Sequence, residues 1–304
     1  MMPVIAVLAW ALSALSVAAF AGRAWWVLDV VASFRPQLAL LLLTATILLA
    51  LGRWWRTCTV LAAITMVNLA VIAPLFFGPP RARSADLRVI SFNLLSSNES
   101  FEEVIDFISG SGADLVVLHE ASLPWEVALA DADLPYDLTM TRHPDDIFGS
   151  LVLAPAGSVV ESYGFRIDDP RAVAIGLPDG VDVLAIHPLS PYTRSRAINR
   201  DRQLHFAQDW VNEQRGPVVV VGDFNATPWS YPYRRLLAET ALLDSARGFG
   251  VGWSYPVQSN PLLWVAIDHL LYSPELSVAD RRLGPALGSD HFALTVDLAT
   301  APSD

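Results

Sequence analysis

Residues 218–225 read VVVVGDFN, an apolar run that ends in an acid and an amide. Four consecutive valines after Pro217 predict a strand that is covered on both faces. Asp223 and Asn225 leave the end of this strand with their side chains on the same side, because side chains alternate along a strand. Two oxygen-bearing side chains held in this way suit a hard divalent cation and the phosphate that it polarises. The alternative is a strand followed by an Asx-rich turn without a site.

Polar residues stand at the ends of further apolar runs. Asn93 ends the run LRVISFN, and Glu120 ends the run DLVVLHE. Asp268 lies in the motif IDH, and Asp290 and His291 lie in the motif GSDH, just before another apolar run. In a layered α/β domain such strand ends gather at one rim, where sites are usually built. These positions therefore favour a functional site over a simple turn.

The order of these motifs resembles the endonuclease/exonuclease/phosphatase superfamily over roughly residues 86–298. The GDFN and SDH motifs are specific, whereas the Asn and Glu strands are weak signals that fall in the expected order. The resemblance implies a four-layer α/β sandwich, in which two packed sheets are flanked by helices. It also implies cleavage of a P–O bond that depends on Mg²⁺, with Mn²⁺ as the alternative ion. His119 departs from the family pattern, which often has Gln before the metal-binding Glu, and we expect this His to fill space.

The same resemblance assigns roles to five of these residues. It implies that Glu120 is the principal Mg²⁺ ligand, with Asn93 and Asp290 as further ligands. Asp223 would position or deprotonate the attacking water. Asn225 would hydrogen-bond the phosphoryl oxygens as charge develops on them.

Three more residues complete the expected catalytic set. His291, paired with Asp268, would form an oriented imidazole that acts as a base or binds the scissile phosphate. His187 follows the strand VDVLAI and resembles the family's central catalytic His, which donates a hydrogen bond to the phosphate or the leaving group. The sequence leaves open which group is the general base.

Hydrophobic residues make up 53% of the chain and are concentrated in its first 80 residues. Three segments are almost continuously apolar, namely residues 3–21, 37–51 and 58–77. A membrane-spanning helix needs about 20 apolar residues, which the first and third segments supply and the second supplies if it begins near Val30. We expect three transmembrane helices within residues 1–78. A signal peptide over residues 1–22 is the alternative, but it would lack a basic N-terminal region and two more apolar segments follow it.

The boundary after the membrane region is sharp. Residues 79–85 begin with two prolines that cannot continue a helix, so we expect a linker there and a catalytic domain over residues 86–304. Three spans place that domain on the side opposite the N-terminus. Arg53 and Arg56 favour a cytoplasmic second loop, although the arginines after the third span favour the reverse. We expect a multi-pass protein of the cell membrane with an extracytoplasmic catalytic domain, as the resemblance to membrane-tethered bacterial proteins implies.

Strands and helices alternate in the expected catalytic domain. Helices are predicted over residues 100–109 and 193–214. Further strands are predicted at residues 149–154, 171–177, 181–187, 265–272 and 291–298. The second helix carries a cluster of arginines that would bind a substrate phosphate or form a solvated face, namely Arg194, Arg196, Arg200 and Arg202.

Charge narrows the choice of substrate. Residues 81–304 contain sixteen Arg, no Lys and thirty acidic residues, which is a formal charge of −14. Proteins that bind extended nucleic acid use basic patches to neutralise its phosphates. The negative charge of this domain therefore favours a small or lipid-linked phosphoester as the substrate over extended nucleic acid. A nuclease with the same site is the alternative. A catalytically silent membrane scaffold is disfavoured by the complete set of site residues.

Overall fold

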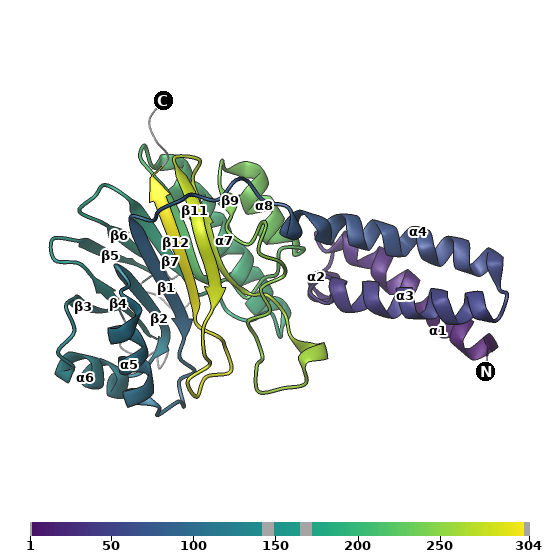
Figure 1. Cartoon of the computed structure of the whole chain (residues 1–304), viewed down its shortest axis with the longest axis horizontal. Helices are drawn as coiled ribbons and strands as arrows, with labels where there is room; N and C mark the ends of the chain where they lie inside the picture. The colour runs from purple at the N-terminus through teal and green to yellow at the C-terminus, as the bar shows by residue number, and fades with distance from the viewer. Residues whose placement is uncertain (1, 142–148, 165–171, 301–304) are drawn as a thin grey trace.

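Two six-stranded β-sheets pack face to face in the C-terminal two thirds of the chain, and a bundle of helices formed by the N-terminal residues projects from one end (Figure 1). The computed structural model describes residues 2–141, 149–164 and 172–300. The central strands are apolar on both faces and need a layer on each side. The N-terminal helices are apolar all round, which is typical of helices that face other helices or lipid.

The first sheet has the strand order β11-β12-β1-β2-β4-β3. Its strands are β1 (Leu87–Asn93), β2 (Leu115–Ala121), β3 (Asp137–Thr141), β4 (Gly149–Ala154), β11 (Leu276–Leu283) and β12 (Leu294–Thr300). β1 and β2 run parallel, and the other neighbours run antiparallel. Asn93 lies opposite His119 in the parallel pair, so Asn93 and Glu120 emerge at the same edge of the sheet.

The second sheet has the strand order β5-β6-β7-β8-β10-β9. Its strands are β5 (Val159–Tyr163), β6 (Ala172–Gly176), β7 (Asp182–Ile186), β8 (Val218–Asp223), β9 (Leu243–Asp244) and β10 (Asp268–Tyr272). β7 and β8 run parallel, as β1 and β2 do in the first sheet. β10 pairs antiparallel with β8 so that Asp268 lies opposite Asp223.

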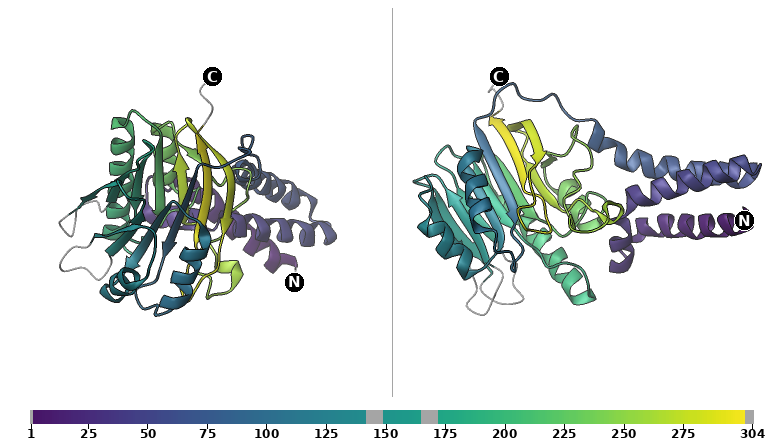
Figure 2. Two further views of the ribbon diagram at one scale, coloured as in Figure 1. Left: turned by 60° about the vertical axis from the view of Figure 1, so that its left-hand side comes forward. Right: turned by 60° about the horizontal axis from the view of Figure 1, so that its bottom comes forward.

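Helices cover the outer face of each sheet (Figures 1 and 2). α5 (Phe101–Ser111) and α6 (Leu123–Asp131) pack on the first sheet, where Trp125 is fully buried. α7 (Arg194–Glu213) and α8 (Tyr231–Glu239) pack on the second sheet, where Tyr233 is fully buried. The expected four-layer α/β sandwich is therefore confirmed.

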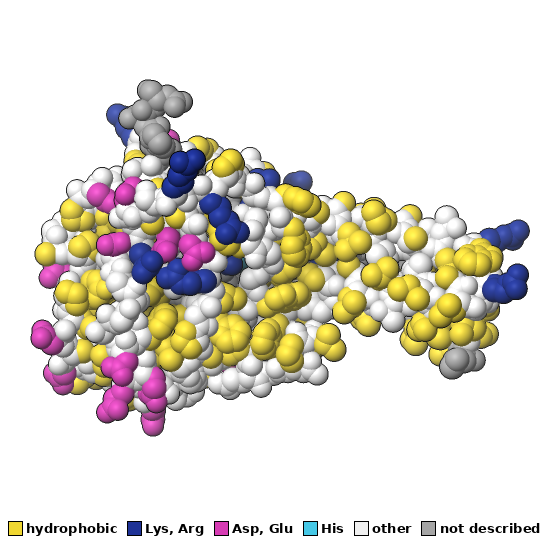
Figure 3. All heavy atoms as spheres, viewed as in Figure 1, with side chains coloured by type: hydrophobic (Ala, Val, Ile, Leu, Met, Phe, Trp, Pro, Cys, Tyr) yellow, Lys and Arg dark blue, Asp and Glu magenta, His cyan; other side chains and the backbone are white. Residues whose placement is uncertain are grey.

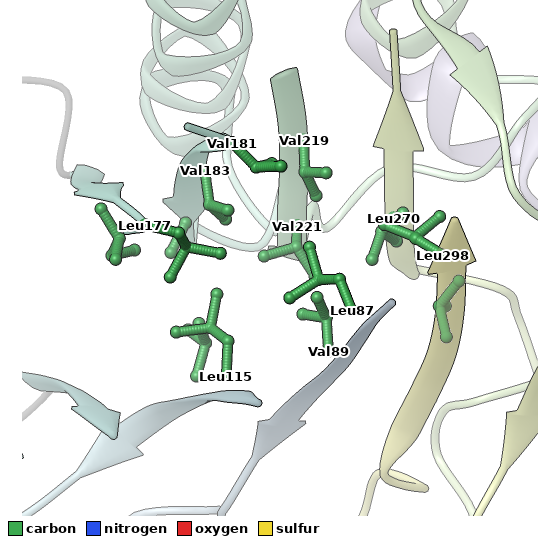
Figure 4. Close-up of a cluster of buried hydrophobic side chains, with 14 of the residues drawn as sticks. Leu87, Val89, Leu115, Leu177, Val181, Val183, Val219, Val221, Leu270 and Leu298 are labelled. Carbon is green, nitrogen blue, oxygen red and sulfur yellow. The ribbon is translucent and has the colours of Figure 1, made fainter. Parts of the chain in front are cut away.

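The four valines of β8 are divided between two cores, because side chains alternate along a strand. Val219 and Val221 lie in the core between the sheets, together with Val89 of β1 (Figure 4). Val218 and Val220 lie in the core beneath α7 and α8. None of these valines is more than 3% exposed, so the strand is covered on both faces as expected.

Several expected elements are present with shifted boundaries. The expected helices are α5 and α7. β10 begins at Asp268 rather than at residue 265, because Val265 instead pairs with Tyr255 in the preceding loop. β12 begins at Leu294 rather than at residue 291, because a turn occupies the residues before it.

The four edge strands, β3, β5, β9 and β11, are not among the strands predicted from the sequence. β11 contains Asp280, Arg281 and Arg282, which interrupt the apolar alternation, and its register with β12 shifts between Val278 and Asp280. The strand expected at residues 171–177 is present as β6. Residue 171, the first of the expected range, lies outside the described part of the chain.

The N-terminal residues form α1 (Met2–Ala18), η1 (Ala19–Ala21), α2 (Trp26–Ala32), α3 (Arg35–Leu51), α4 (Trp55–Ile72) and η2 (Ala73–Phe76). By length and composition, Met2–Ala21 and Trp55–Phe76 could each cross a membrane. α2 and α3 are bent by 66° and make a third candidate span if they count as one. The N-terminus and the turn between α3 and α4 lie at the end of the bundle far from the sheets (Figure 1).

A buried ion pair joins the bundle to the second sheet's helices. Asp29 of α2 and Arg200 of α7 are each 2% exposed, and Nη2 of Arg200 donates to Oδ2 of Asp29 at 2.7 Å. The backbone N–H of Tyr231 donates to Oδ1 of Asp29 at 2.5 Å. Nη1 of Arg200 donates to the carbonyl of Asn225 at 3.4 Å. An acid from the N-terminal region is thereby connected to the loop that follows β8.

The first turn of α3 makes a second junction. Nε2 of Gln37 donates to the carbonyl of Trp264 at 2.7 Å. Ala39 and Ile72 from the bundle share an apolar cluster with Trp229 from the domain. The bundle and the domain therefore meet through a packed interface as well as through the connecting chain.

The connecting chain lies along the first sheet. The backbone N–H of Ala82 donates to the carbonyl of Val278 at 3.0 Å, and that of Asp86 donates to the carbonyl of Leu298 at 2.8 Å. The guanidinium of Arg81 lies 4.1 Å from the centre of the Phe249 ring. These contacts hold the segment against the domain.

Candidate active site

All eight residues singled out from the sequence lie at one rim of the sandwich. Asn93 ends β1 and Asp223 ends β8, so each sheet contributes the end of a central strand. Glu120 lies in β2, and Asp268 begins β10. The other four lie in loops at the ends of strands, namely His187, Asn225, Asp290 and His291.

The carboxylate of Asp223 is the centre of this site. Its Oδ2 accepts hydrogen bonds from Nδ2 of Asn93 at 3.1 Å and from Nδ2 of Asn225 at 3.3 Å. Nε2 of His187 and Nε2 of His291 lie 3.6 Å and 3.7 Å from the same oxygen. Four nitrogen atoms from the two sheets and their loops therefore converge on one buried oxygen.

Asp268 and His291 form a buried pair beside Asp223. Oδ2 of Asp268 lies 2.8 Å from Nδ1 of His291. The ring of Tyr255 lies against the imidazole, with ring centroids 4.6 Å apart. The backbone N–H of Asp268 donates to Oγ of Ser254 at 3.3 Å. These contacts fix the imidazole so that its Nε2 faces Asp223.

Burial and charge shift the pKa values in this group. Burial raises the pKa of Asp223 to about 6, although the imidazole of His291 opposes the shift. Burial alone would lower the pKa of His291, but Asp268 and Asp223 outweigh it and raise this pKa to about 9. Burial would raise the pKa of Asp268, but the charge and hydrogen bond of His291 hold it below its ordinary value. At neutral pH an imidazolium therefore lies between two carboxylates.

Glu120 and Asp290 supply the accessible carboxylates of the site, with side chains 20% and 26% exposed. Nδ2 of Asn93 donates to Oε1 of Glu120 at 3.1 Å, and Nε2 of His187 lies 3.7 Å from the same oxygen. Burial and the charge of Glu120 raise the pKa of Asp290, whereas His291 lowers it. Glu120 and Asp290 are therefore close enough to repel each other, and a cation would relieve that repulsion.

These residues fit a divalent cation through their oxygen atoms. Within the described ranges, no three His, Cys, Asp or Glu side chains form a ready metal-binding group. Mg²⁺ keeps several waters and needs only one or two protein carboxylates. Glu120 and Asp290 match that requirement, whereas Asn93 would have to turn its amide, because its Oδ1 accepts from the backbone N–H of Leu95 and its Nδ2 faces Glu120.

The backbone around Asp223 explains the glycine that precedes it. Gly222 has a φ of 144°, and a Cβ there would collide with the carbonyl oxygen of Ile186. The same Cβ would lie 2.8 Å from Nε2 of His119. His119 is fully buried, and its Nδ1 lies 3.1 Å from Oγ of Ser150. His119 therefore fills the space beneath the end of β8.

Three further residues support the site without a strong sequence signal. Tyr255 stacks on the catalytic imidazole from a loop whose sequence has no recognisable motif. Oγ of Ser289, within the SDH motif, donates to the carbonyl of Asn93 at 2.6 Å and so ties that motif to β1. Arg200 is buried, pairs with Asp29 and Asp201, and contacts the site only through the backbone carbonyl of Asn225. The isolated acid in an apolar region is the signal that could have revealed this pair.

Solved structures share the fold of this domain. Humanized TDP2 from D. rerio is 15% identical, with a TM-score of 0.59 over 70% of this chain and 99% of its own. The mannosyl-6-phosphatase Bt3783 from Bacteroides thetaiotaomicron is 17% identical, with a TM-score of 0.55 over 70% of this chain and 100% of its own. An endonuclease/exonuclease/phosphatase from Beutenbergia cavernae is 19% identical, with a TM-score of 0.53 over 71% of this chain and 72% of its own. No curated protein matches the sequence.

A family model identifies the domain from the sequence itself. The model described as "Endonuclease/Exonuclease/phosphatase family" matches residues 90–291, about two thirds of the chain. The matched range contains all eight residues of the site. Members of this family hydrolyse phosphoester bonds with the help of divalent metal ions. The chain therefore belongs to the endonuclease/exonuclease/phosphatase family and is a metal-dependent hydrolase of phosphoester bonds.

Proposed function

We propose that the protein is a membrane-anchored phosphohydrolase that cleaves a P–O bond in a small or lipid-linked phosphoester by attack of water. One observation carries this proposal. The nitrogens of Asn93, His187 and His291 converge on Asp223 directly beside the accessible carboxylate of Glu120. This arrangement offers a proton acceptor, anion-binding groups and a cation site within a few ångströms of one another.

Asp223 would accept the proton of the attacking water. With a pKa near 6 it is mostly ionised at neutral pH and still basic enough to take a proton. As the water oxygen bonds to phosphorus, its proton would pass to Asp223, and the bond from phosphorus to the leaving oxygen would break. His291 is already protonated at this pH, so it would bind the phosphate rather than act as the base.

Nitrogen donors would stabilise the charge that develops on the phosphoryl oxygens. The imidazolium of His291 and Nε2 of His187 both face the space around Asp223. Nδ2 of Asn225 donates to the carbonyl of Pro188 at 2.9 Å and to Asp223 at 3.3 Å, so it would give up the longer bond to donate to a phosphoryl oxygen. Preorganised donors of this kind act where the charge of the transition state appears.

Glu120 would hold the metal ion, with Asn93 and Asp290 as further ligands. We propose Mg²⁺ as the ion, with Mn²⁺ as an alternative. Such an ion neutralises phosphoryl oxygens and so adds to the donors described above.

Residues 1–78 would anchor the enzyme, residues 79–85 would connect the two parts, and residues 86–304 would carry the site. Arg53 and Arg56 are exposed at the far tip of the bundle, whose surface is otherwise largely hydrophobic (Figure 3). A short basic loop favours the cytoplasmic side of a membrane. The catalytic domain would therefore lie outside the cytoplasm, in a multi-pass protein of the cell membrane.

Charge and anchoring support a substrate at the membrane. The domain's formal charge of −14 disfavours long contacts with nucleic acid. The likeness to a mannosyl-6-phosphatase supports a small phosphoester. A polyprenyl pyrophosphate combines such a group with a lipid chain, and its hydrolysis by water would release phosphate and leave the polyprenyl monophosphate.

The test is release of phosphate from a polyprenyl pyrophosphate by the detergent-solubilised full chain with Mg²⁺. Release should disappear in the Asp223→Asn variant and after chelation with EDTA. Asp209→Asn is a matched control, because Asp209 is exposed on α7. No release from folded protein that binds Mg²⁺ would refute this substrate class.

A nuclease is the second candidate. The likeness to D. rerio TDP2 complexed with a single-strand DNA product supports this reading. Cleavage of single-stranded DNA that falls steeply with salt, together with no phosphate release from the lipid, would favour it.

A further inference from the structure

A hydrophobic loop lies between the active site and the apolar helices. Residues 253–266, termed here the η3 loop, contain the short helix η3 (Pro261–Leu263) at their tip. Leu262 and Leu263 are 61% and 54% exposed. Figures 1 and 2 place this tip on the side of the domain from which the helices leave. Single exposed apolar residues are ordinary, but two adjacent leucines between a proline and a tryptophan form a patch.

Contacts with α3 fix the position of the η3 loop along the axis of the helical bundle. Gln37, whose side chain donates to the carbonyl of Trp264, is the third residue of α3. Ala266 shares an apolar cluster with Ala39 of the same helix. The same cluster contains Ile72 and Leu75, near the end of the candidate span Trp55–Phe76, so the loop lies at the level where that span would leave the bilayer.

The charge of this segment differs from that of the rest of the domain. Residues 248–267 contain no Asp, Glu, Lys or Arg. The domain around them has thirty acidic residues, which anionic lipid headgroups would repel. An uncharged segment with leucine and tryptophan is suited to the interface between headgroups and acyl chains.

The other part of the η3 loop forms a wall of the active site. Tyr255 lies against the ring of His291, and the backbone N–H of Val257 donates to the carbonyl of Asp290 at 2.9 Å. The same loop therefore contacts the catalytic imidazole near one end and carries the exposed leucines farther along.

An aromatic pocket of about 460 Å³ adjoins the η3 loop. Trp253 and Trp264 of the loop line it together with Phe292, and Arg281 and Arg282 of β11 also belong to its lining. The ring centroids of Trp264 and Phe292 are 5.6 Å apart. Phe249, which also lines the pocket, lies between two glycines whose N–H groups donate to the carbonyl of Leu75 in η2. The pocket thus borders the end of a candidate span.

We propose that the η3 loop is a second contact with the bilayer, in which Leu262 and Leu263 insert among the lipids, and that this contact brings the active site to phosphoesters in the same leaflet. Insertion removes the exposed leucines from water. The contact with the bilayer stands on the geometry of the loop alone, whereas the substrate part rests on the proposed function.

Depth measurement tests the bilayer contact without any activity. Cys58 is the single cysteine of the chain, so a Cys58→Ser background accepts one label. Leu262→Cys would carry an environment-sensitive fluorophore in vesicles of phosphatidylcholine and phosphatidylglycerol. Lipids brominated in their acyl chains should quench it roughly twofold or more, and aqueous iodide should not. Val159→Cys, at a residue 63% exposed on β5 at the edge of the second sheet, should show the opposite behaviour.

Two results would overturn the bilayer contact. One is equal quenching by iodide at both positions, which would place the loop in water. The other is protection of the Leu262→Cys label that grows with the ratio of protein to lipid, which would indicate that a second copy of the chain covers the patch.

Kinetics test whether the inserted loop gives the active site access to a lipid substrate. The double variant Leu262→Gln/Leu263→Gln should lower kcat/KM for a lipid phosphoester in vesicles roughly tenfold. The kcat/KM for a soluble aryl phosphoester should not change. Val159→Gln is the control. Equal losses on both substrates would contradict a role in lipid access. If the unaltered protein hydrolyses neither substrate, the proposed function fails, and the fluorescence result still decides the bilayer contact.

Discussion

In the helical bundle many large apolar side chains are exposed and several small or polar ones are buried, whereas in the two-sheet domain the large apolar side chains lie between the layers. In α1, Ala9 and Ser16 are buried, but Val7 and Leu8 are well exposed. In the domain, long runs of Val and Leu are buried between layers. Without a hydrophobic driving force between helices in lipid, close approach of small residues and internal hydrogen bonds hold a bundle together. The two regions are therefore built for different solvents.

A buried ion pair, rather than apolar packing alone, connects the two regions where they meet. Asp29 is the single acid in the first 80 residues, and it reaches Arg200 in the domain. Burying two charges is expensive unless each is paired and hydrogen-bonded, as both are here. Because both charges need their partners, this ion pair favours one particular arrangement of the bundle and the domain.

The largest effect is expected in the domain alone. Asp223→Asn should lower kcat/KM roughly 10²–10⁴-fold, because it removes the group that accepts the proton. Thermal unfolding should change little, because the substitution removes a buried charge and keeps the shape. Phosphate release and circular dichroism measure the two quantities. Activity within threefold of the unaltered enzyme would exclude Asp223 as the base.

The next largest effect is expected at the junction. Asp29→Ala should destabilise the protein by about 1–3 kcal/mol, because the buried guanidinium of Arg200 loses Asp29 and keeps only its second carboxylate partner, Asp201. Unfolding of the domain in detergent micelles measures this loss. In Asp29→Ala/Arg200→Leu part of the stability should return. A double variant whose loss equals the sum of the single losses would show that the pair is not coupled.

A smaller effect is expected inside the bundle. Oδ1 of Asn68 accepts hydrogen bonds from Nη1 of Arg35 at 3.0 Å and from Oγ of Ser16 at 3.1 Å. Asn68→Leu should cost about 1–2 kcal/mol of bundle stability. Thr44→Val is the matched control, because Thr44 is exposed on α3 and bonds only to its own helix among the described contacts. Equal effects of the two variants would argue against a buried polar layer.

The smallest effect is expected between β1 and β12 of the first sheet. Arg88 donates to Asp297 at 2.6 Å, and this bond holds the pKa of Asp297 below its ordinary value. Asp297→Asn should cost about 1 kcal/mol at neutral pH. A lowered pKa means that this stability is present above pH 4 or so and is lost as pH falls through the folded-state pKa. Unfolding of both proteins at pH 7 and pH 3 should therefore converge at the lower pH.

The rim of the active site is predictable because its residues end apolar runs. Asn93, Glu120 and Asp223 each lie at the end of a strand. The valines and leucines before them indicate how long the strand is and that it is buried. The parallel direction of β1 and β2, and of β7 and β8, then brings those ends to one edge. Local pattern and sheet geometry are sufficient for this part of the fold.

Contacts between distant segments carry no such pattern. Tyr255 reaches His291 from a loop in which no residue stands out, and Asp29 reaches Arg200 across 171 positions of the chain. β11 could not be predicted from the sequence pattern, because an edge strand tolerates charged residues that a central strand does not. Tertiary packing, rather than local preference, decides these features.

The packed junction between bundle and domain has a kinetic consequence. Asp29 and Gln37 attach the domain to two different helices, so the domain cannot swing on its connecting chain. With the membrane anchoring and the lipid-linked substrate proposed above, the distance between the rim and the bilayer surface would be fixed. Encounters would then take place in two dimensions, and turnover would depend on the number of substrate molecules per unit area. Diluting the substrate with other lipids should slow the enzyme even when its total concentration is unchanged.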